Sequence, residues 1–254
     1  MSKRSLAAAA GLLCALAAMG QTADELIEKN IQARGGLAKL QSIQTLRLIG
    51  TMSVEDQRMP STLEIKRPNK TRWEFTVDGE TGIQAYDGKT GWVLMPFEGK
   101  TQPEEMSPED LKDIELQADI DGPLVDYKSK GNRVELLGRE KVDERDAWRL
   151  RVTLKNGESR DLYLDAGTSL QFLSVTRRTV DGREVEVESA ISDYRAVGGV
   201  LLPHLFEASV KGAPQKQTLK FDKIEVNMPI DDSRFQMPPR RSEPPRPAET
   251  PTIS

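Results

Sequence analysis

The sequence predicts a mainly β protein (α+β): a strongly curved antiparallel sheet, or half-barrel, of about eleven strands. From residue 44 onward, apolar and polar side chains alternate with a period of two, which is typical of half-buried strands. Asp-Gly and Asn-Gly pairs separate many of these runs and indicate hairpins, so antiparallel connections dominate. The chain shows no repeat of about 34 to 45 residues, which argues against a propeller or solenoid. A sheet of this many strands in one small domain must curl or close.

One helix is predicted before the first strand, packed on the concave side of the sheet. Thr22 and Glu25 form a capping box, in which each side chain bonds a backbone N–H at the helix start. Gly35 and Gly36 end the helix. Its apolar side carries Leu26, Ile27 and Ile31. A short second helical turn is indicated by Leu37, Leu40 and Ile43.

The alternation places strands along most of the remaining chain. Near the end, the apolar residues change phase between Phe221 and Ile224, which predicts a β-bulge at Asp222 and Lys223. The predicted strands lie near residues 45–54, 62–66, 72–77, 83–86, 92–95, 133–137, 148–154, 160–165, 170–178, 184–194, 201–210 and 217–226.

Residues 98–128 form an acidic insert that is the least strand-like part of the chain. Residues 98–121 contain nine acidic residues and only two lysines. Ser107 and Pro108 start a helix as N-cap and first residue, and Met106 can pack on Leu111 as a hydrophobic staple. A further helical stretch is possible around residues 123–127. We interpret the first helix as a lid over the concave side with the apolar face Leu111, Ile114 and Ala118; the alternative is an acidic helix that never opens.

Both ends of the chain differ in composition from the middle. Residues 1–20 begin with Lys3 and Arg4, continue as an uncharged Ala-rich run, and offer a cleavage site near Gly20, the layout of an export signal. A retained anchor and lipidation at Cys14 are the alternatives. Residues 238–254 hold six prolines and three arginines and predict an extended or disordered tail. That tail is a loose end, a spacer, a Pro-rich ligand for a partner, or a weak contact to an anionic membrane. The folded domain is therefore expected at residues 21–237.

Composition excludes several classes of function. One His and one Cys cannot form a zinc site of His and Cys ligands or a disulfide framework. The net charge of −4, or −6 without residues 1–20, argues against nucleic-acid binding. A catalytic triad requires a His, here only His204, which we interpret as structural or exposed. No P-loop, nucleophile-elbow or metalloprotease motif occurs, so we expect no catalytic residue, metal or cofactor.

Several short motifs occur in an order that resembles a known family. They are residues 33–37 (ARGGL), 86–92 (YDGKTGW), 162–165 (LYLD), 199–204 (GVLLPH) and 231–235 (DDSRF). Together with the export signal, N-terminal helix, hairpins and helical insert, they resemble the periplasmic lipoprotein carriers of the LolA/LolB type. The closer resemblance is to outer-membrane lipoprotein-sorting proteins, and it spans residues 21–237.

This resemblance implies an unclosed barrel whose concave face holds acyl chains in an apolar cavity beneath helices, without catalysis. It implies a soluble, monomeric periplasmic carrier or chaperone for lipoprotein acyl chains or lipids, moving them towards the outer membrane with partners at both membranes. Gln21, rather than a lipidated Cys, favours the soluble type. The candidate lining residues, for which a plain core role is the alternative, are Leu46, Leu48, Met52, Leu63, Ile65, Trp73, Phe75, Trp92, Leu94 and Met95.

The family's carriers also use a strand arginine to control release. Four arginines lie in the corresponding part of this chain and stay equal candidates: Arg47, Arg58, Arg67 and Arg72. Two other functions remain open: an envelope sensor or protein-interaction module with the same fold, and an enzyme that depends on His204.

Overall fold

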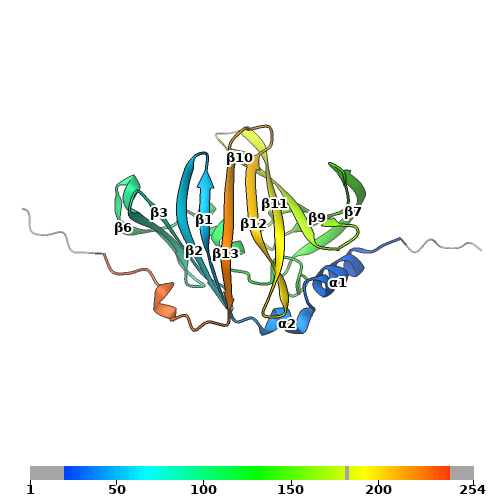
Figure 1. Cartoon of the computed structure of the whole chain (residues 1–254), viewed down its shortest axis with the longest axis horizontal. Helices are drawn as coiled ribbons and strands as arrows, with labels where there is room; N and C mark the ends of the chain where they lie inside the picture. Colours follow the sequence, from blue (N-terminus) through cyan, green and yellow to red (C-terminus); the bar gives the residue numbers. More distant parts are fainter. Residues whose placement is uncertain (1–19, 181–182, 241–254) are drawn as a thin grey trace, which may run out of the picture.

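The computed structural model describes residues 20–180 and 183–240, and these form one long, curved antiparallel sheet (Figure 1). Within them the sheet has thirteen strands in the order β6-β5-β4-β3-β2-β1-β13-β12-β11-β10-β9-β8-β7. The two edge strands, β6 and β7, do not pair, so the barrel is unclosed. The predicted export signal and most of the predicted tail lie outside the described residues.

The strands of the first half are β1 (Thr45–Val54), β2 (Gln57–Lys66), β3 (Lys70–Val77), β4 (Glu80–Tyr86), β5 (Gly91–Met95) and β6 (Lys100–Glu105). The strands of the second half are β7 (Arg133–Val142), β8 (Arg145–Thr153), β9 (Ser159–Asp165), β10 (Gln171–Val180), β11 (Arg183–Val197), β12 (Val200–Val210) and β13 (Lys216–Val226). Consecutive strands pair with each other, except for β6 and β7, which residues 106–132 separate. At the centre of the sheet, β1 pairs with β13.

The fold class is as predicted, but the described residues form thirteen strands rather than about eleven, and one of them, β6, lies inside the acidic insert where no strand is predicted. Its sequence, KTQPEE, shows no apolar alternation, so the period of two does not reveal it. β6 is an edge strand, where charged residues and Pro103 are tolerated because one side needs no sheet partner.

The helices begin and end close to their predicted positions. In α1 (Ala23–Ala33), Thr22 and Glu25 form the predicted capping box, and α2 (Leu37–Ser42) follows the glycine pair. α3 (Pro108–Gln117) begins after Ser107, whose hydroxyl accepts a hydrogen bond from the Asp110 N–H. Residues 123–127 form turns, so the possible helix there is absent.

The predicted bulge is present in β13. Ile49 pairs with Lys223 and Gly50 pairs with Phe221, so Asp222 is the additional residue. At this point the two backbones approach so closely that a Cβ at Gly50 would overlap the carbonyl oxygen of Lys220.

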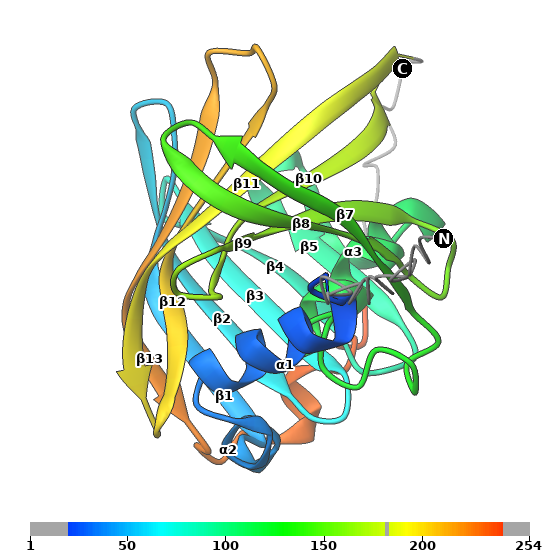
Figure 2. The same cartoon turned by 90° about the vertical axis from the view of Figure 1, so that its right-hand side faces the viewer.

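The concave side of the sheet holds the core. Leu26 and Ile27 of α1 are buried against Leu150, Leu162 and neighbouring residues of β8 and β9. A second cluster joins α2 to β1, β2, β12 and β13 at the centre of the sheet. Figure 2 shows α1 and α3 lying within the curve of the sheet. The helices therefore cover the concave side, as expected.

The opposite face of β2 to β5 is covered by the chain after β13. The short helix η2 (Asp232–Arg234) precedes Phe235, which is fully buried and accepts a 2.8 Å hydrogen bond from Trp92 Nε1 at its carbonyl. Arg234 Nε lies 2.6 Å from the buried carboxylate of Glu64. These contacts hold residues 229–237 on the outer face.

Candidate functional site

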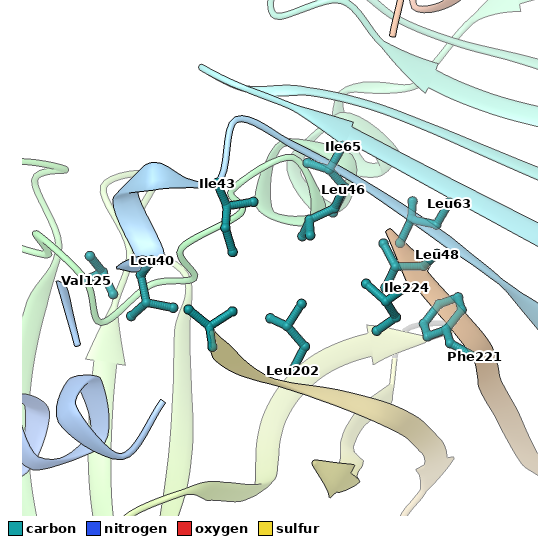
Figure 3. Packing of buried hydrophobic residues seen from close by; sticks show 11 residues of the cluster. Leu40, Ile43, Leu46, Leu48, Leu63, Ile65, Val125, Leu202, Phe221 and Ile224 are labelled. Atoms are coloured by element: carbon teal, nitrogen blue, oxygen red, sulfur yellow. The ribbon is translucent and has the colours of Figure 1, made fainter. Parts of the chain in front are cut away.

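A cavity of about 440 Å³ lies between the concave face and the segments that cover it. Most of its apolar wall comes from four adjacent strands, β2, β1, β13 and β12, and Ile191 of β11 adds to it. Figure 3 shows side chains from these strands facing a common interior. The residues that the four strands contribute to this wall are Leu46, Leu48, Leu63, Ile65, Leu202, Phe206, Leu219, Phe221 and Ile224.

The remaining wall is formed by α3 and the turns after it, residues 108–124, which we call the cover, and by the polar end of the cavity. Ile120, Pro123 and Leu124 come from the turns after α3, and Gln117 comes from α3 itself. The other polar side chains that line the cavity come from α1, from the turns after α3, and from strands β10 and β11. They are Asn30, Arg34, Asp119, Asp121, Gln171 and Tyr194. The cavity is therefore amphipathic, with an apolar wall and a polar end.

The structure brings four of the ten candidate lining residues together in this cavity: Leu46, Leu48, Leu63 and Ile65. Met52, Phe75 and Met95 instead pack with Met59 in a separate buried cluster farther along the strands. Trp73 and Met95 line a second hollow, also about 440 Å³, beneath α3. Gln117 borders both hollows, so the end of α3 separates them.

Trp92 and Leu94 line neither hollow, because they lie on the other face of the sheet. Val93 of the same strand lines the hollow beneath α3, and neighbouring residues of a strand point to opposite faces. Trp92 is buried under Phe235 and pairs across the sheet with Ala85. Alternation along a strand does not show that the outer face is also covered, so it predicts the concave side for a buried tryptophan, and for Trp92 this prediction is wrong.

The predicted lid residues pack on the sheet. Ile114 and Ala118 are buried against Tyr86 of β4, and Leu111 and Met106 pack around them. Burial, together with the carboxylate of Glu115 at 3.3 Å from its hydroxyl, raises the pKa of Tyr86 to about 12. α3 is thus docked over β3 and β4 in this structure, and its opening remains a prediction.

The ten predicted lining residues do not include those of β12 and β13. Leu219 and Phe221 follow the same period of two as the first strands. The bulge at Asp222 then turns Ile224 to the same face of β13, so that it lines the same cavity. That signal was present in the sequence. What it could not provide was the pairing of β1 with β13, which places the two ends of the chain around one cavity.

Arg34 reaches the polar end of the cavity because two glycine-containing motifs pack together there. The Arg34 N–H donates to Asn30 O, and the Leu201 N–H donates to Arg34 O at 2.8 Å. Gly35 has a φ of 121°, and a Cβ there would lie 2.7 Å from the carbonyl oxygen of Gly199. This close approach fixes the backbone at Arg34, while its Nη1 donates to the carbonyl oxygen of Asp121 at 3.0 Å.

The four candidate release arginines occupy different places. Arg47 and Arg72 lie on the outer face with Glu64 and Glu74, and Arg58 is exposed. Arg67 alone bonds the cover: its two Nη atoms each lie 2.6 Å from one carboxylate oxygen of the buried Asp121. These hydrogen bonds raise the pKa of Arg67. Arg67 also donates to the carbonyls of Ile43 and Leu40, so it joins α2, the sheet and the cover.

Three further features of the described residues concern catalysis, metal binding and membrane spanning. His204 is buried, with Nδ1 at 3.0 Å from the carbonyl oxygen of Leu202, and it does not line the cavity. No group of three His, Cys, Asp or Glu side chains among the described residues is placed to hold a metal ion. None of the described helices is both long enough and apolar enough to cross a bilayer.

Comparison with solved structures shows which proteins share this architecture. A LolA superfamily protein from Nitrosomonas europaea matches with a TM-score of 0.57 and 15% identity, over 85% of this chain and 98% of that one. A DUF1329 family protein from Desulfovibrio piger matches with a TM-score of 0.61 and 13% identity, over 84% and 96%. A domain described as outer membrane lipoprotein-sorting, from Vibrio parahaemolyticus, matches with a TM-score of 0.57 and 11% identity, over 82% and 95%.

No family model and no curated protein matches the sequence. The likeness is therefore one of fold: the chain has the LolA-type unclosed barrel, as the sequence motifs indicated. The match extends over nearly the whole of each of these three structures, from 95% to 98% of their chains.

Proposed function

We propose that this protein is a carrier that shelters an acyl chain of a lipoprotein or lipid in the cavity on its concave face. The observation that carries the proposal is an apolar wall, made mainly by four adjacent strands, that remains unfilled beneath a helical cover. Each methylene transferred from water to such a wall contributes about 0.8 kcal/mol. The cavity volume lies within the range of about 300 to 1,000 Å³ that is usual for ligand pockets.

The proposal includes export to the periplasm and transfer towards the outer membrane. The layout of residues 1–20 supports export, and the fold shared with a lipoprotein-sorting domain supports a role in the envelope. A protein exported in this way would begin at Gln21, which intact-mass measurement of the periplasmic fraction checks. The cavity acts by binding rather than catalysis, and the partners at each membrane belong to the same proposal.

The cavity is tested by filling it without changing the outer face. Leu63→Trp places an indole in the cavity, whereas Thr62→Trp, the matched control, adds the same group on the other face of β2. We expect Leu63→Trp to weaken binding of a fluorescent long-chain acyl probe at least about tenfold, which corresponds to about 1.4 kcal/mol, and the control to bind as the wild type does.

Equal binding by both variants and the wild type would contradict the proposal, provided that circular dichroism shows all three folded. A wild-type protein that binds no acyl probe, yet retains an envelope protein in a pull-down, would instead support the sensor or interaction module.

A further inference from the structure

The polar end of the cavity holds a positive charge that the surrounding acids do not neutralise. Asp121 is engaged by both Nη atoms of Arg67, and Asp119 accepts two hydrogen bonds from Lys130 Nζ at 2.8 and 2.6 Å. Each of these acids therefore has its own cation. With Arg34 included, these groups are three cations and two anions, and the exposed Asp126 adds a weaker attraction to Arg67 rather than to Arg34.

Arg34 is the cation of this cluster that has no acidic partner among the described residues. Its one side-chain hydrogen bond there goes to the carbonyl oxygen of Asp121, whereas a guanidinium has five N–H donors. Burial lowers the pKa of Arg34, and the negative charges of Asp121 and Asp119 oppose this only in part. A guanidinium nevertheless stays protonated in proteins, so the charge is retained in a desolvated place.

The groups beside Arg34 are positioned by bonds of their own. Asn30 Nδ2 donates to the carbonyl oxygen of Ser169 at 2.8 Å, and the Tyr194 hydroxyl donates to that of Gln171 at 2.8 Å. Burial raises the pKa of Tyr194 to about 12, so this hydroxyl stays neutral and offers no countercharge. The polar end is thus a fixed shell around one available cation.

The same cavity continues from this cation to the apolar wall. Arg34, Leu46, Leu63 and Phe221 border one space, so a ligand within it contacts a charge at one end and hydrocarbon along its length. Arginine binds carboxylates and phosphates through two parallel hydrogen bonds, and such charge-assisted bonds are stronger where water is excluded.

We propose that Arg34 binds the head group of the ligand, and that the ligand is an amphiphile with an oxyanion, carboxylate or phosphate, on an alkyl chain that lies along the apolar wall. This inference rests on the proposed carrier function and narrows its ligand class. It also assigns different tasks to two arginines: Arg67 holds the cover, and Arg34 recognises the ligand.

The test compares three ligands of equal chain length by isothermal titration calorimetry with the full chain: dodecanoate, dodecyl phosphate and uncharged dodecanol. The proteins are the wild type, Arg34→Met, Arg34→Lys and the control Arg195→Met, an exposed arginine paired with Asp193. We expect the wild type and the control to bind an anionic ligand at least about tenfold more tightly than dodecanol. The tighter of the two anions shows whether the site prefers a carboxylate or a phosphate.

We expect Arg34→Met to bind the anions only as tightly as dodecanol, with dodecanol binding unchanged, and Arg34→Lys to lie between. An undiminished preference for anions in Arg34→Met overturns the inference, as does a wild type without preference. An equal loss of dodecanol and dodecanoate would show that Arg34 only supports the cavity, and this also overturns it. A wild type that binds none of the three contradicts the carrier function itself, which separates the two failures.

Discussion

At the scale of single residues, the charges that matter most are buried at the boundaries between elements. Asp121 is 6% exposed and depends on Arg67 for its countercharge, and this pair attaches the cover to the sheet. A buried carboxylate without a cation has lost its hydration and gained nothing in return. The pair is therefore expected to stabilise the closed cover rather than the sheet alone.

Arg67→Met should lower the free energy of unfolding by about 2 to 3 kcal/mol, below the full range for buried pairs because Arg67 is partly exposed. The double variant Arg67→Met with Asp121→Asn should recover part of this loss, since no buried charge then lacks a partner. Denaturant unfolding of the two single variants and the double variant gives the coupling. Additive losses would show that the two side chains do not act as a pair.

Asp161 on the outer face provides a pH-dependent contribution. Burial raises its pKa, but hydrogen bonds from Arg151 and Arg149 outweigh this, and the net pKa lies below the ordinary value of 3.8. A depressed pKa in the folded state stabilises the protein above the unfolded pKa, and this stability is lost as the pH falls through the folded pKa.

The wild type should therefore exceed Asp161→Asn in stability by about 1 to 3 kcal/mol at pH 7, because Asn accepts weaker hydrogen bonds from the two arginines. The difference should shrink as the pH falls below about 4, where the Asp161 carboxyl of the unfolded chain begins to be protonated while that of the folded protein is still charged. Urea unfolding at several pH values measures it, with the exposed Asp56→Asn as the control. A difference that stays constant down to pH 2 contradicts this explanation.

At the scale of elements, the pairing of β1 with β13 is the contact that forms the cavity, because it joins the first and last strands. The bulge at Asp222 brings the backbones so close at Gly50 that no side chain fits there. The phase shift that indicates the bulge was visible in the sequence. Its consequence for Gly50 was not, because it depends on the register between strands about 170 residues apart.

Gly50→Ala should destabilise the protein by about 3 kcal/mol or more, at the upper end for overpacking, because its Cβ meets backbone that cannot rotate away. Thr51→Ala, the next residue on the other face, is the control and should cost far less. Thermal unfolding compares the two. A loss below about 1 kcal/mol at Gly50 would show that the two strands can separate locally without cost.

Element by element, the parts with strong local signals were predictable. The capping box of α1, the N-cap of α3 and most strands follow from side-chain chemistry within a few residues. β6 was missed because an edge strand needs no apolar alternation, and Trp92 was misplaced because its cover, Phe235, lies 143 residues away in sequence. Arg34 was part of a motif, but its place in the cavity depends on the packing of Gly35 against Gly199.

At the scale of the whole molecule, the sheet, the helices and the turns surround an internal cavity that has an apolar wall and a polar end. The long sheet curls around helices and turns that leave part of its apolar wall unfilled, and the cover is attached by Arg67 at one position and by the packing of α3 on Tyr86 at another. Under the proposed carrier function, an acyl chain in the cavity adds dispersion contacts with the apolar wall, so a bound ligand should stabilise the protein. Ligand binding and stability should therefore be linked in this protein.

The most direct test of the carrier function is native mass spectrometry of the protein purified gently from its own envelope fraction. We predict a population whose mass exceeds that of the protein alone by the mass of an acyl-containing molecule, which is released on collisional activation and is absent from Leu63→Trp. A wild-type protein that carries no such molecule, and takes none up when incubated with a lipid extract of the envelope, would contradict the account.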